Sequence, residues 1–388
     1  MSDTKQFLVE KFQQVYGRQP EAVFFAPGRV NLIGDHTDYN GGMVLPAALT
    51  MGTYLAVAKN RIGHWNIASL NKDNIWTMCS VERPLRHYCW VDYPLGICQE
   101  FTARGIKLEG YNLLYFGDLP IGASLSSSAS IELATAIAFN AISGNPFSQL
   151  ELVKISQHAE NHFVEMNCGI MDQFASGFGK EGRAIALDCN TLDYELVPLE
   201  MQGLSFVISN TNKPRELVNS AYNQRRNDCQ AALELLQQHC EIESLCQLSV
   251  AEFDKLHPGL LSGEVLRRAR HAISEHQRVK EAVHALKAHD MARFGQLMNE
   301  SHDSLRDDYE VSCPELDFLV TESRKSDGVL GSRMTGAGFG GCTITLLNNE
   351  KTADFIHQIG TKYQEKFNIS ADFYTVEIGD GARSLSLD

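Results

Sequence analysis

Basic side chains are scarce in this sequence of 388 residues. There are 34 lysines and arginines against 48 aspartates and glutamates, which gives a formal net charge of −14. Nucleic-acid binding generally requires a basic face, so this balance argues against a nucleic-acid partner. An anionic ligand would have to be captured by local backbone geometry, because the overall field of the protein repels it.

Long apolar runs and paired cysteines are also missing. No stretch reaches the roughly 18 apolar residues of a membrane-spanning helix, and the best candidate, 133–142, is interrupted by Thr135 and Asn140. The opening residues, MSDTKQFLVEKF, lack an apolar signal core, so we expect a cytoplasmic protein. None of the ten cysteines forms a CxxC pair, which favours reduced thiols over zinc or redox chemistry. The oligomeric state is not encoded in these patterns, and we expect a monomer.

The remaining pattern predicts an α+β protein with two domains, because the chain exceeds one typical domain in length. Strands cluster early and helices dominate the middle, and we place the boundary near residue 190, between an N-terminal domain at 1–190 and a C-terminal domain at 191–388. Helical spacing is predicted at 4–16, 129–142, 150–167, 222–239, 265–286 and 353–367. Strands are predicted at 23–26, 30–34, 110–117, 204–208 and 342–347, with short strand-like segments across 51–98.

An acidic turn stands in the stretch APGRVNLIGDHTDYNGG at 26–42. Asp35, His36 and Asp38 fall within four residues, directly after an apolar run. The following asparagine and glycines tolerate positive φ, which is typical of a turn. A solvated turn is the simplest interpretation, and the other motifs have to decide whether it suffices.

A serine-rich loop, LPIGASLSSSAS at 119–130, joins a predicted strand to an apolar helix. Small residues let the backbone approach a ligand, and the first turn of the helix offers free N–H groups for an anion. Helix capping explains one serine, but it explains less well the run Ser126, Ser127 and Ser128, whose hydroxyls could bond phosphate or Mg²⁺. The loop matches neither GxxxxGK[ST] nor GxGxxG.

A glycine-rich stretch, RMTGAGFGGC at 333–342, lies near the end of the sequence. Four glycines in ten residues are more than packing alone requires. The stretch is interpreted either as a chain that wraps closely around a ligand or as a bend between two strands.

Together these stretches resemble the galactokinases of the GHMP kinase superfamily. The first is similar to the galactokinase signature, the second to the superfamily phosphate loop and the third to its third motif, while CGIMDQ at 168–173 is similar to the segment with the catalytic aspartate. The motifs appear in family order over the whole chain. The resemblance implies a two-domain GHMP kinase fold with the active site in the inter-domain cleft. It also implies phosphorylation of the C1 hydroxyl of D-galactose with ATP and Mg²⁺.

The resemblance also implies roles for individual residues. Asp172 matches the catalytic aspartate, and Arg29 its partner beside the C1 hydroxyl. The sugar-binding residues implied are Asp35, His36, Asp38, Gly169 and Tyr222. The nucleotide-binding residues implied are Gly122, Ala123, Ser124, Leu125, Ser126, Ser127, Ser128 and Ala129, and the Mg²⁺ ligands are Ser128 and Glu160. Without the resemblance, Glu160 and Tyr222 would be interpreted as ordinary helix residues.

These residue types suit the implied reaction. Carboxylates accept short, charge-assisted hydrogen bonds, so a rigid turn with two acids and a histidine can bind several sugar hydroxyls. Asp172 would either take the C1 proton or hold that hydroxyl in line, and Arg29 would keep it ionised.

Two residues depart from the family pattern. Asp35 stands where the family usually has glutamate, so its sugar contact would need a backbone shift or a bridging water. Ser124 replaces the second glycine of the phosphate loop, which questions the need for positive φ there.

Two alternatives stay open. One is a non-catalytic sensor that binds galactose and ATP; such relatives have a disrupted serine loop, whereas SSSAS and Asp172 are intact here. The other is a kinase for a related sugar such as N-acetylgalactosamine, which the side chains around the C2 hydroxyl would decide.

Overall fold

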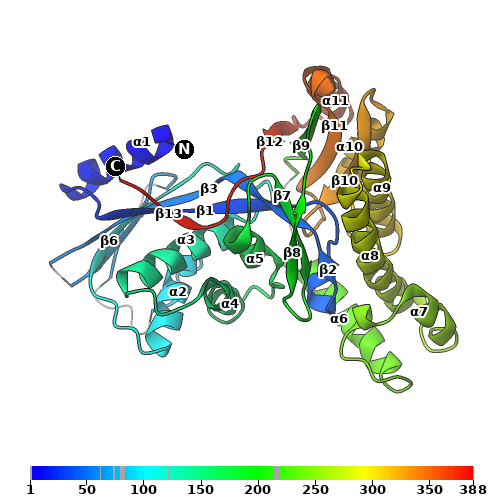
Figure 1. The fold of residues 1–388 in the computed structure, drawn as a ribbon, viewed down its shortest axis with the longest axis horizontal. Helices are drawn as coiled ribbons and strands as arrows, with labels where there is room; N and C mark the ends of the chain where they lie inside the picture. The colour runs from blue at the N-terminus through cyan, green and yellow to red at the C-terminus, as the bar shows by residue number, and fades with distance from the viewer. Residues whose placement is uncertain are drawn as a thin grey trace.

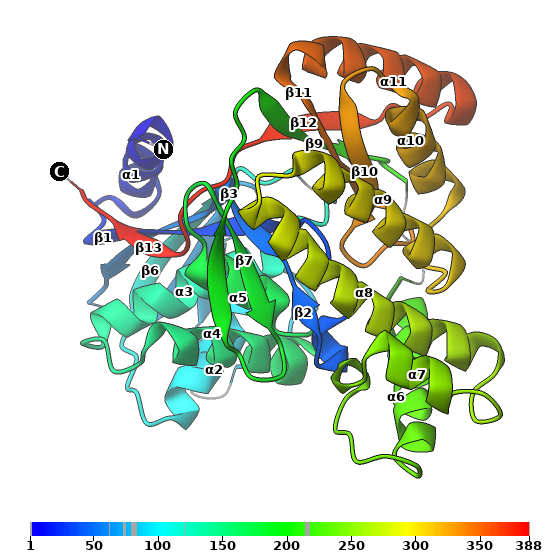
Figure 2. The same ribbon diagram turned by 45° about the vertical axis from the view of Figure 1, so that its right-hand side comes forward.

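The computed structural model describes residues 2–61, 63–72, 75–78, 84–120, 122–213 and 218–387. Two lobes stand side by side, and the small sheet β2-β7-β8 lies between them (Figures 1 and 2). This sheet consists of β2 (Met43–Val44), β7 (Arg183–Asp188) and β8 (Tyr194–Pro198). Among the described residues, no helix combines the length and apolarity that crossing a membrane requires.

The first lobe is built on a mixed sheet with the strand order β13-β1-β3-β6-β4-β5. Helix α1 covers one face and α2 to α5 cover the other (Figure 1). Because successive strand residues point to opposite faces, Phe24 packs against the helical layer and Phe25 against α1. The elements are α1 (Ser2–Tyr16), β1 (Ala22–Asn31), η1 (Asp38–Asn40), β3 (Pro46–Lys59), β4 (Trp65–Ser69), β5 (Ile75–Met78), α2 (Asp92–Ala103), β6 (Tyr111–Gly117), α3 (Ser127–Ile142), α4 (Gln149–Ala159), the π-helical turn η2 (Glu160–Val164), α5 (Met171–Phe178) and β13 (Arg383–Leu385).

The second lobe contains an antiparallel sheet with the order β10-β11-β9-β12. Helices α8 and α9 pack on one face through Val283 and Leu297, and α10 and α11 pack on the other through Leu319 and Phe355. The elements are β9 (Leu204–Asn210), α6 (Val218–Leu236), η3 (Leu245–Gln247), α7 (Val250–Leu256), α8 (Gly263–Lys287), α9 (Met291–Asp307), α10 (Pro314–Lys325), β10 (Val329–Thr335), β11 (Cys342–Asn348), η4 (Asn349–Lys351), α11 (Thr352–Phe367) and β12 (Asp372–Val376).

The end of the chain returns to the first lobe. Strand β13 pairs antiparallel with β1, with Leu385 opposite Val23. Just before it, the Ala382 amide donates to the Ser176 carbonyl of α5 at 2.8 Å. The α+β class with two domains is confirmed, whereas the division at residue 190 stays a prediction.

Most predicted elements lie close to their expected positions. The six predicted helices correspond to α1, α3, α4, α6, α8 and α11, and the strands at 110–117, 204–208 and 342–347 correspond to β6, β9 and β11. These segments have strong periodicity and polar flanks, so local pattern is sufficient to locate them.

The expectation that Pro27 and Gly28 separate two strands was wrong. A single strand, β1, continues through them to Asn31, with a register shift between Pro27 and Arg29. Pro27 stays opposite Gly52, and the irregularity leaves Gly28 and residues 49–51 of β3 out of the register. Proline is tolerated next to such a bulge. A Cβ on Gly28 would clash with the Leu125 carbonyl, so this glycine serves a close approach of the phosphate loop.

Two other boundaries were also wrong. The strand-like interpretation of 51–98 fails at its end, where α2 begins at Asp92. Gly96 lowers the helix propensity there, yet it packs tightly against Ala159 and Phe163, so tertiary contact overrides propensity. The helix predicted over 150–167 is α-helical only to Ala159 and continues as the π-helical turn η2 to Val164.

Candidate active site

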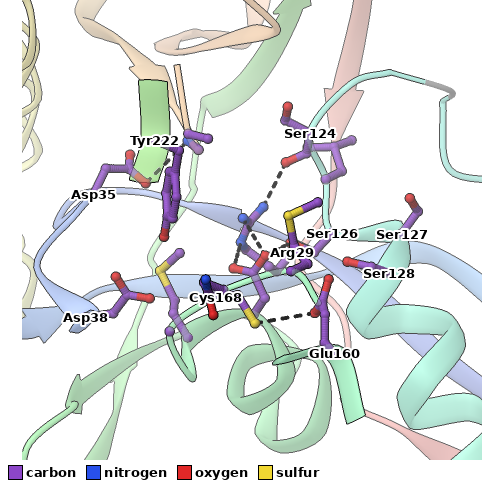
Figure 3. Close-up of a pocket in the computed structure, with 18 of the residues that line it drawn as sticks. Arg29, Asp35, Asp38, Ser124, Ser126, Ser127, Ser128, Glu160, Cys168 and Tyr222 are labelled. Atoms are coloured by element: carbon purple, nitrogen blue, oxygen red, sulfur yellow. Dashed lines mark hydrogen bonds and ion pairs between the residues drawn. The ribbon is translucent and has the colours of Figure 1, made fainter. Parts of the chain in front are cut away.

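One pocket collects residues from all four sequence motifs (Figure 3). Every predicted site residue lines it except Ala129, which is buried in the first turn of α3. The acidic turn and Tyr222 lie on one side and the serines on the other, with Arg29 between them (Figure 3). Segments that lie as far apart in sequence as Arg29 and Ala337 therefore form one site.

Arg29 and Asp172 form a bidentate ion pair inside this pocket. Arg29 Nε donates to Asp172 Oδ1 at 2.8 Å, and Nη2 donates to Oδ2 at 2.9 Å. The remaining Nη1 donates to the Ser124 carbonyl at 2.8 Å. Asp172 stands in the first turn of α5, where the helix dipole favours a negative charge. The arginine thus joins the acid of α5 to the phosphate loop.

Asp172 has a third donor. Ser126 Oγ donates to its Oδ2 at 2.5 Å, and Ser126 is buried. With both oxygens held, the carboxylate has a fixed orientation toward the pocket.

Asp35 is held by three donors of its own. Its Oδ1 accepts from Asn31 Nδ2 at 3.0 Å and from the Gly336 amide at 3.3 Å, and its Oδ2 accepts from Arg333 at 2.5 Å. A carboxylate has about four acceptor positions, so about one remains for a ligand. The acid therefore also fastens the first motif to the third.

His36 is fixed by aromatic neighbours. Its Nδ1 lies 2.8 Å from the Tyr39 hydroxyl, and its ring packs against Tyr309 and Tyr222 with centroids 4.8 and 5.7 Å away. Burial lowers its pKa to about 4, outweighing the opposite effect of Asp35. The imidazole is therefore neutral at pH 7 and has one donor and one acceptor nitrogen.

The position of the Asp38 carboxylate requires a glycine at residue 169. A Cβ at Gly169 would overlap the Asp38 carboxylate, so no larger residue fits there. Burial, and then the charge of Asp172, raise the pKa of Asp38 to about 7. The ionised form of this carboxyl is therefore destabilised, although a hydrogen bond from the Tyr39 amide partly opposes the shift.

The phosphate loop keeps the left-handed backbone expected of glycine. Ser124 has φ 55° and Ser126 has φ 58°, so the serine at 124 did not remove the requirement for positive φ. Gly336 of the third motif faces this loop: a Cβ there would lie 3.5 Å from that of Ser124. The glycine-rich stretch thus closes over the phosphate loop.

Glu160 and Ser128 form an oxygen-rich corner. Glu160 is the first residue of η2, and its carboxylate accepts from Gln173 Nε2 at 2.6 Å. Burial, and then the charge of Asp172, raise its pKa to about 7, although a hydrogen bond from Ser128 opposes this shift. A hydroxyl and a carboxylate are hard oxygen ligands, and Mg²⁺ commonly uses one or two protein carboxylates together with substrate phosphates. The donors therefore fit a magnesium ion.

Several residues of the pocket were not predicted. Cys168 and Met171 lie within a motif that was quoted for its aspartate, and Ala337 lies in the glycine-rich stretch, so these motifs gave a signal. Glu165 and Met166 line the pocket because η2 ends there, and no sequence pattern marks a π-helical turn.

Comparison with known proteins shows the family of the chain. The galactokinase galactose-binding signature matches residues 10–59, the GHMP kinases N terminal domain matches 92–180, and the GHMP kinases C terminal domain matches 282–365. Galactokinases of Bacillus subtilis and Clostridium acetobutylicum are 49% and 48% identical to the chain, over 96% and 99% of it and 97% and 100% of their own lengths. The crystal structure of Lactococcus lactis galactokinase complexed with galactose superposes with a TM-score of 0.95 at 41% identity, covering 98% of this chain and 100% of that one.

More distant structures share only the fold. A mevalonate kinase superposes with a TM-score of 0.67 at 17% identity, over 92% of this chain and 99% of that one. Full-length coverage at nearly half identity places the sequence much closer to the galactokinases. The chain belongs to the galactokinase family of the GHMP kinases.

Proposed function

We propose that this protein transfers the terminal phosphoryl group of ATP to the C1 hydroxyl of D-galactose, giving galactose 1-phosphate and ADP. The observation that carries the proposal is the Arg29–Asp172 pair, which lies between the acidic turn and the phosphate loop. Phosphoryl transfer depends mainly on positioning and charge stabilisation. Asp172 accepts a hydrogen bond from the C1 hydroxyl. It takes the proton of this hydroxyl as the C1 oxygen bonds to the terminal phosphorus of ATP and the bond between that phosphorus and ADP breaks.

The sugar is bound by the acidic turn. Asp38 accepts hydroxyl donors, neutral His36 offers one further polar nitrogen, and Gly169 and Tyr222 complete the wall. Asp35 contributes its one remaining acceptor position. A site that hydrogen-bonds a particular hydroxyl can reject an analogue lacking it by a factor of about 10⁴. Rejection of the C4 epimer, glucose, follows from the same principle.

The nucleotide is bound by the serine loop at the start of α3. Among the described lining residues, Arg29 is the basic side chain, against the acids Asp35, Asp38, Asp172, Glu160 and Glu165. A polyphosphate would be repelled by this set. Mg²⁺ bound by Ser128 and Glu160 would supply the missing positive charge. Removal of divalent cations with EDTA is therefore expected to abolish turnover.

The direct test is a panel of sugars with ATP and Mg²⁺. Release of ADP with galactose, little with glucose, and a product phosphorylated at C1 support the proposal. Binding of galactose and ATP without ADP release would instead indicate the sensor. Preferential turnover of N-acetylgalactosamine would indicate the related-sugar kinase.

Replacing Asp172 tests the proposed base. We expect Asp172→Ala to lose at least about 10³-fold in kcat, because general-base catalysis and orientation are removed together. Galactose and an ATP analogue should still bind, which calorimetry can measure. Near-normal turnover would exclude Asp172 from the mechanism.

We further propose that the protein acts as a monomer, because one chain supplies the sugar turn, the acid and the phosphate loop. Sedimentation at micromolar concentration should give the mass of one chain. A stable dimer of equal or greater activity would contradict this.

A further inference from the structure

Ser126 is unusual for a serine at the start of a helix. It occupies the N-cap position of α3, where a serine side chain normally accepts a hydrogen bond from an amide of the first turn. Its hydroxyl makes no such bond. Its backbone has φ 58° and ψ 50°, a left-handed conformation that costs an L-residue about 1–2 kcal/mol. The residue thus forgoes a helix cap and adopts a strained backbone.

The hydroxyl is directed to Asp172 instead. Ser126 Oγ donates to Oδ2 at 2.5 Å, while Arg29 already donates to both oxygens from its own side. Since a carboxylate has about four acceptor positions, three of them are filled. Two of these donors bond to Oδ2 and one bonds to Oδ1, so the acceptor position that stays open is on Oδ1.

We propose that Ser126 is a positioning residue for Asp172: together with Arg29, its hydroxyl leaves one acceptor position, on Oδ1, for the sugar hydroxyl that is phosphorylated. This inference rests on the proposed function, because it requires the acceptor hydroxyl to meet Asp172. A carboxylate with a single open position holds that hydroxyl in one direction. Without Ser126, two positions are open, and a hydroxyl or a water can occupy either.

The neighbouring serines have different surroundings. Ser127 is exposed in the first turn of α3, and Ser128 is hydrogen-bonded to Glu160. The amides of a first helical turn lack intrahelical partners and remain suited to phosphate. The serine run therefore serves the nucleotide through its amides and Ser128, and serves the catalytic acid through the Ser126 hydroxyl.

Two substitutions at this position separate the hydroxyl from the backbone strain. Ser126→Ala removes the hydroxyl and keeps the strain, whereas Ser126→Gly removes both. We expect each variant to lose about 10–100-fold in kcat, the effect typical of a misplaced reacting group. The KM values for galactose and for ATP with Mg²⁺ should stay within about threefold. The glycine variant should melt at a higher temperature than the alanine variant.

Ser124→Gly is the matched control for stability. Ser124 has the same left-handed backbone, with φ 55°, but it bonds to Arg29 through its carbonyl and not through its hydroxyl. The rise in melting temperature of the Ser124→Gly variant therefore measures how much stability is gained when backbone strain alone is relieved. A purely structural role for Ser126 predicts that glycine restores kcat along with stability.

The outcomes are distinct. Equal loss of kcat in both Ser126 variants, with glycine the more stable, supports the inference. Recovery of kcat in Ser126→Gly, unchanged kcat in either variant, or a loss confined to the KM for ATP overturns it. Failure of the unmodified protein to phosphorylate galactose would overturn the proposed function instead.

Discussion

The burial of Asp38 lowers the stability of the unliganded protein at neutral pH. Its pKa is about 7 in the folded chain, against an ordinary value of 3.8. The folded state therefore retains a proton that the unfolded chain has already released. The stability associated with this proton is complete below pH 3.8 and is lost as the pH rises through 7. A sugar hydroxyl that donates to the carboxylate would compensate for this loss on binding.

Asp38→Asn should make the protein more stable at pH 8 and impair it as an enzyme. An amide cannot ionise, so we expect the free energy of unfolding to rise by about 1–3 kcal/mol at pH 8 and to change little at pH 4.5. The kcat/KM for galactose should fall at least about tenfold, because a charge-assisted acceptor is lost. Urea unfolding at both pH values measures the first effect. An equal stability change at both values would contradict the assignment.

The helices that support the site illustrate what local sequence cannot show. Helix α8 was predicted from its periodicity, but the use of Glu275 to hold the acidic turn was not. Glu275 Oε1 accepts from the Gly34 amide at 2.9 Å and from Ser301 at 2.5 Å, although Gly34 lies 241 residues away. Contacts of this kind depend on tertiary structure and leave no local pattern.

The motifs themselves could be predicted, since each places its chemistry within a few residues. The helix that carries Asp172 could not, because α5 is only eight residues long and contains Gly177, which packs against Val153. The bend that aims Arg29 depends on a β-bulge, which sequence periodicity interprets as a break. The sequence therefore predicted the candidate catalytic residues but not the elements that hold them.

Glu275→Gln tests the support that α8 gives to the turn. Burial alone would raise the pKa of Glu275, but Arg278, His271 and Arg333 outweigh it and lower the pKa to about 2. The stability that this carboxylate contributes is present above about pH 4.5 and is lost as the pH falls through 2. We expect the variant to lose about 3 kcal/mol at pH 7, because Arg278 loses a buried partner.

The matched control is Glu281→Gln on the same helix. Glu281 pairs with Arg293 at the surface, and such pairs contribute about 0–1 kcal/mol. The Glu275 variant should also show a raised KM for galactose, whereas the control should not. Equal effects of the two substitutions would mean that the hydrogen bond from the Gly34 amide to Glu275 does not support the acidic turn.

At the scale of the molecule, the two lobes are joined directly behind the pocket. Arg333 of β10 reaches from the second lobe to the first, donating to the carbonyls of Asn31 and Leu32 and to Asp35. Arg333 and Asp35 are 0% and 2% exposed, so this ion pair has no solvent to replace a lost partner. A buried ion pair therefore fastens the acidic turn to the strand that leads into the glycine-rich stretch.

A double-mutant cycle measures how strongly this pair joins the lobes. Asp35→Asn and Arg333→Met should each lower the free energy of unfolding by about 3–5 kcal/mol, because each leaves an uncompensated buried group. The double variant should be more stable than the sum of the two losses predicts, by about 2 kcal/mol or more, since it leaves no isolated charge. Urea unfolding of the four proteins at one pH gives the coupling energy. Additive losses would show that this ion pair does not join the lobes energetically, and the pair would then contribute only to the local geometry of the pocket.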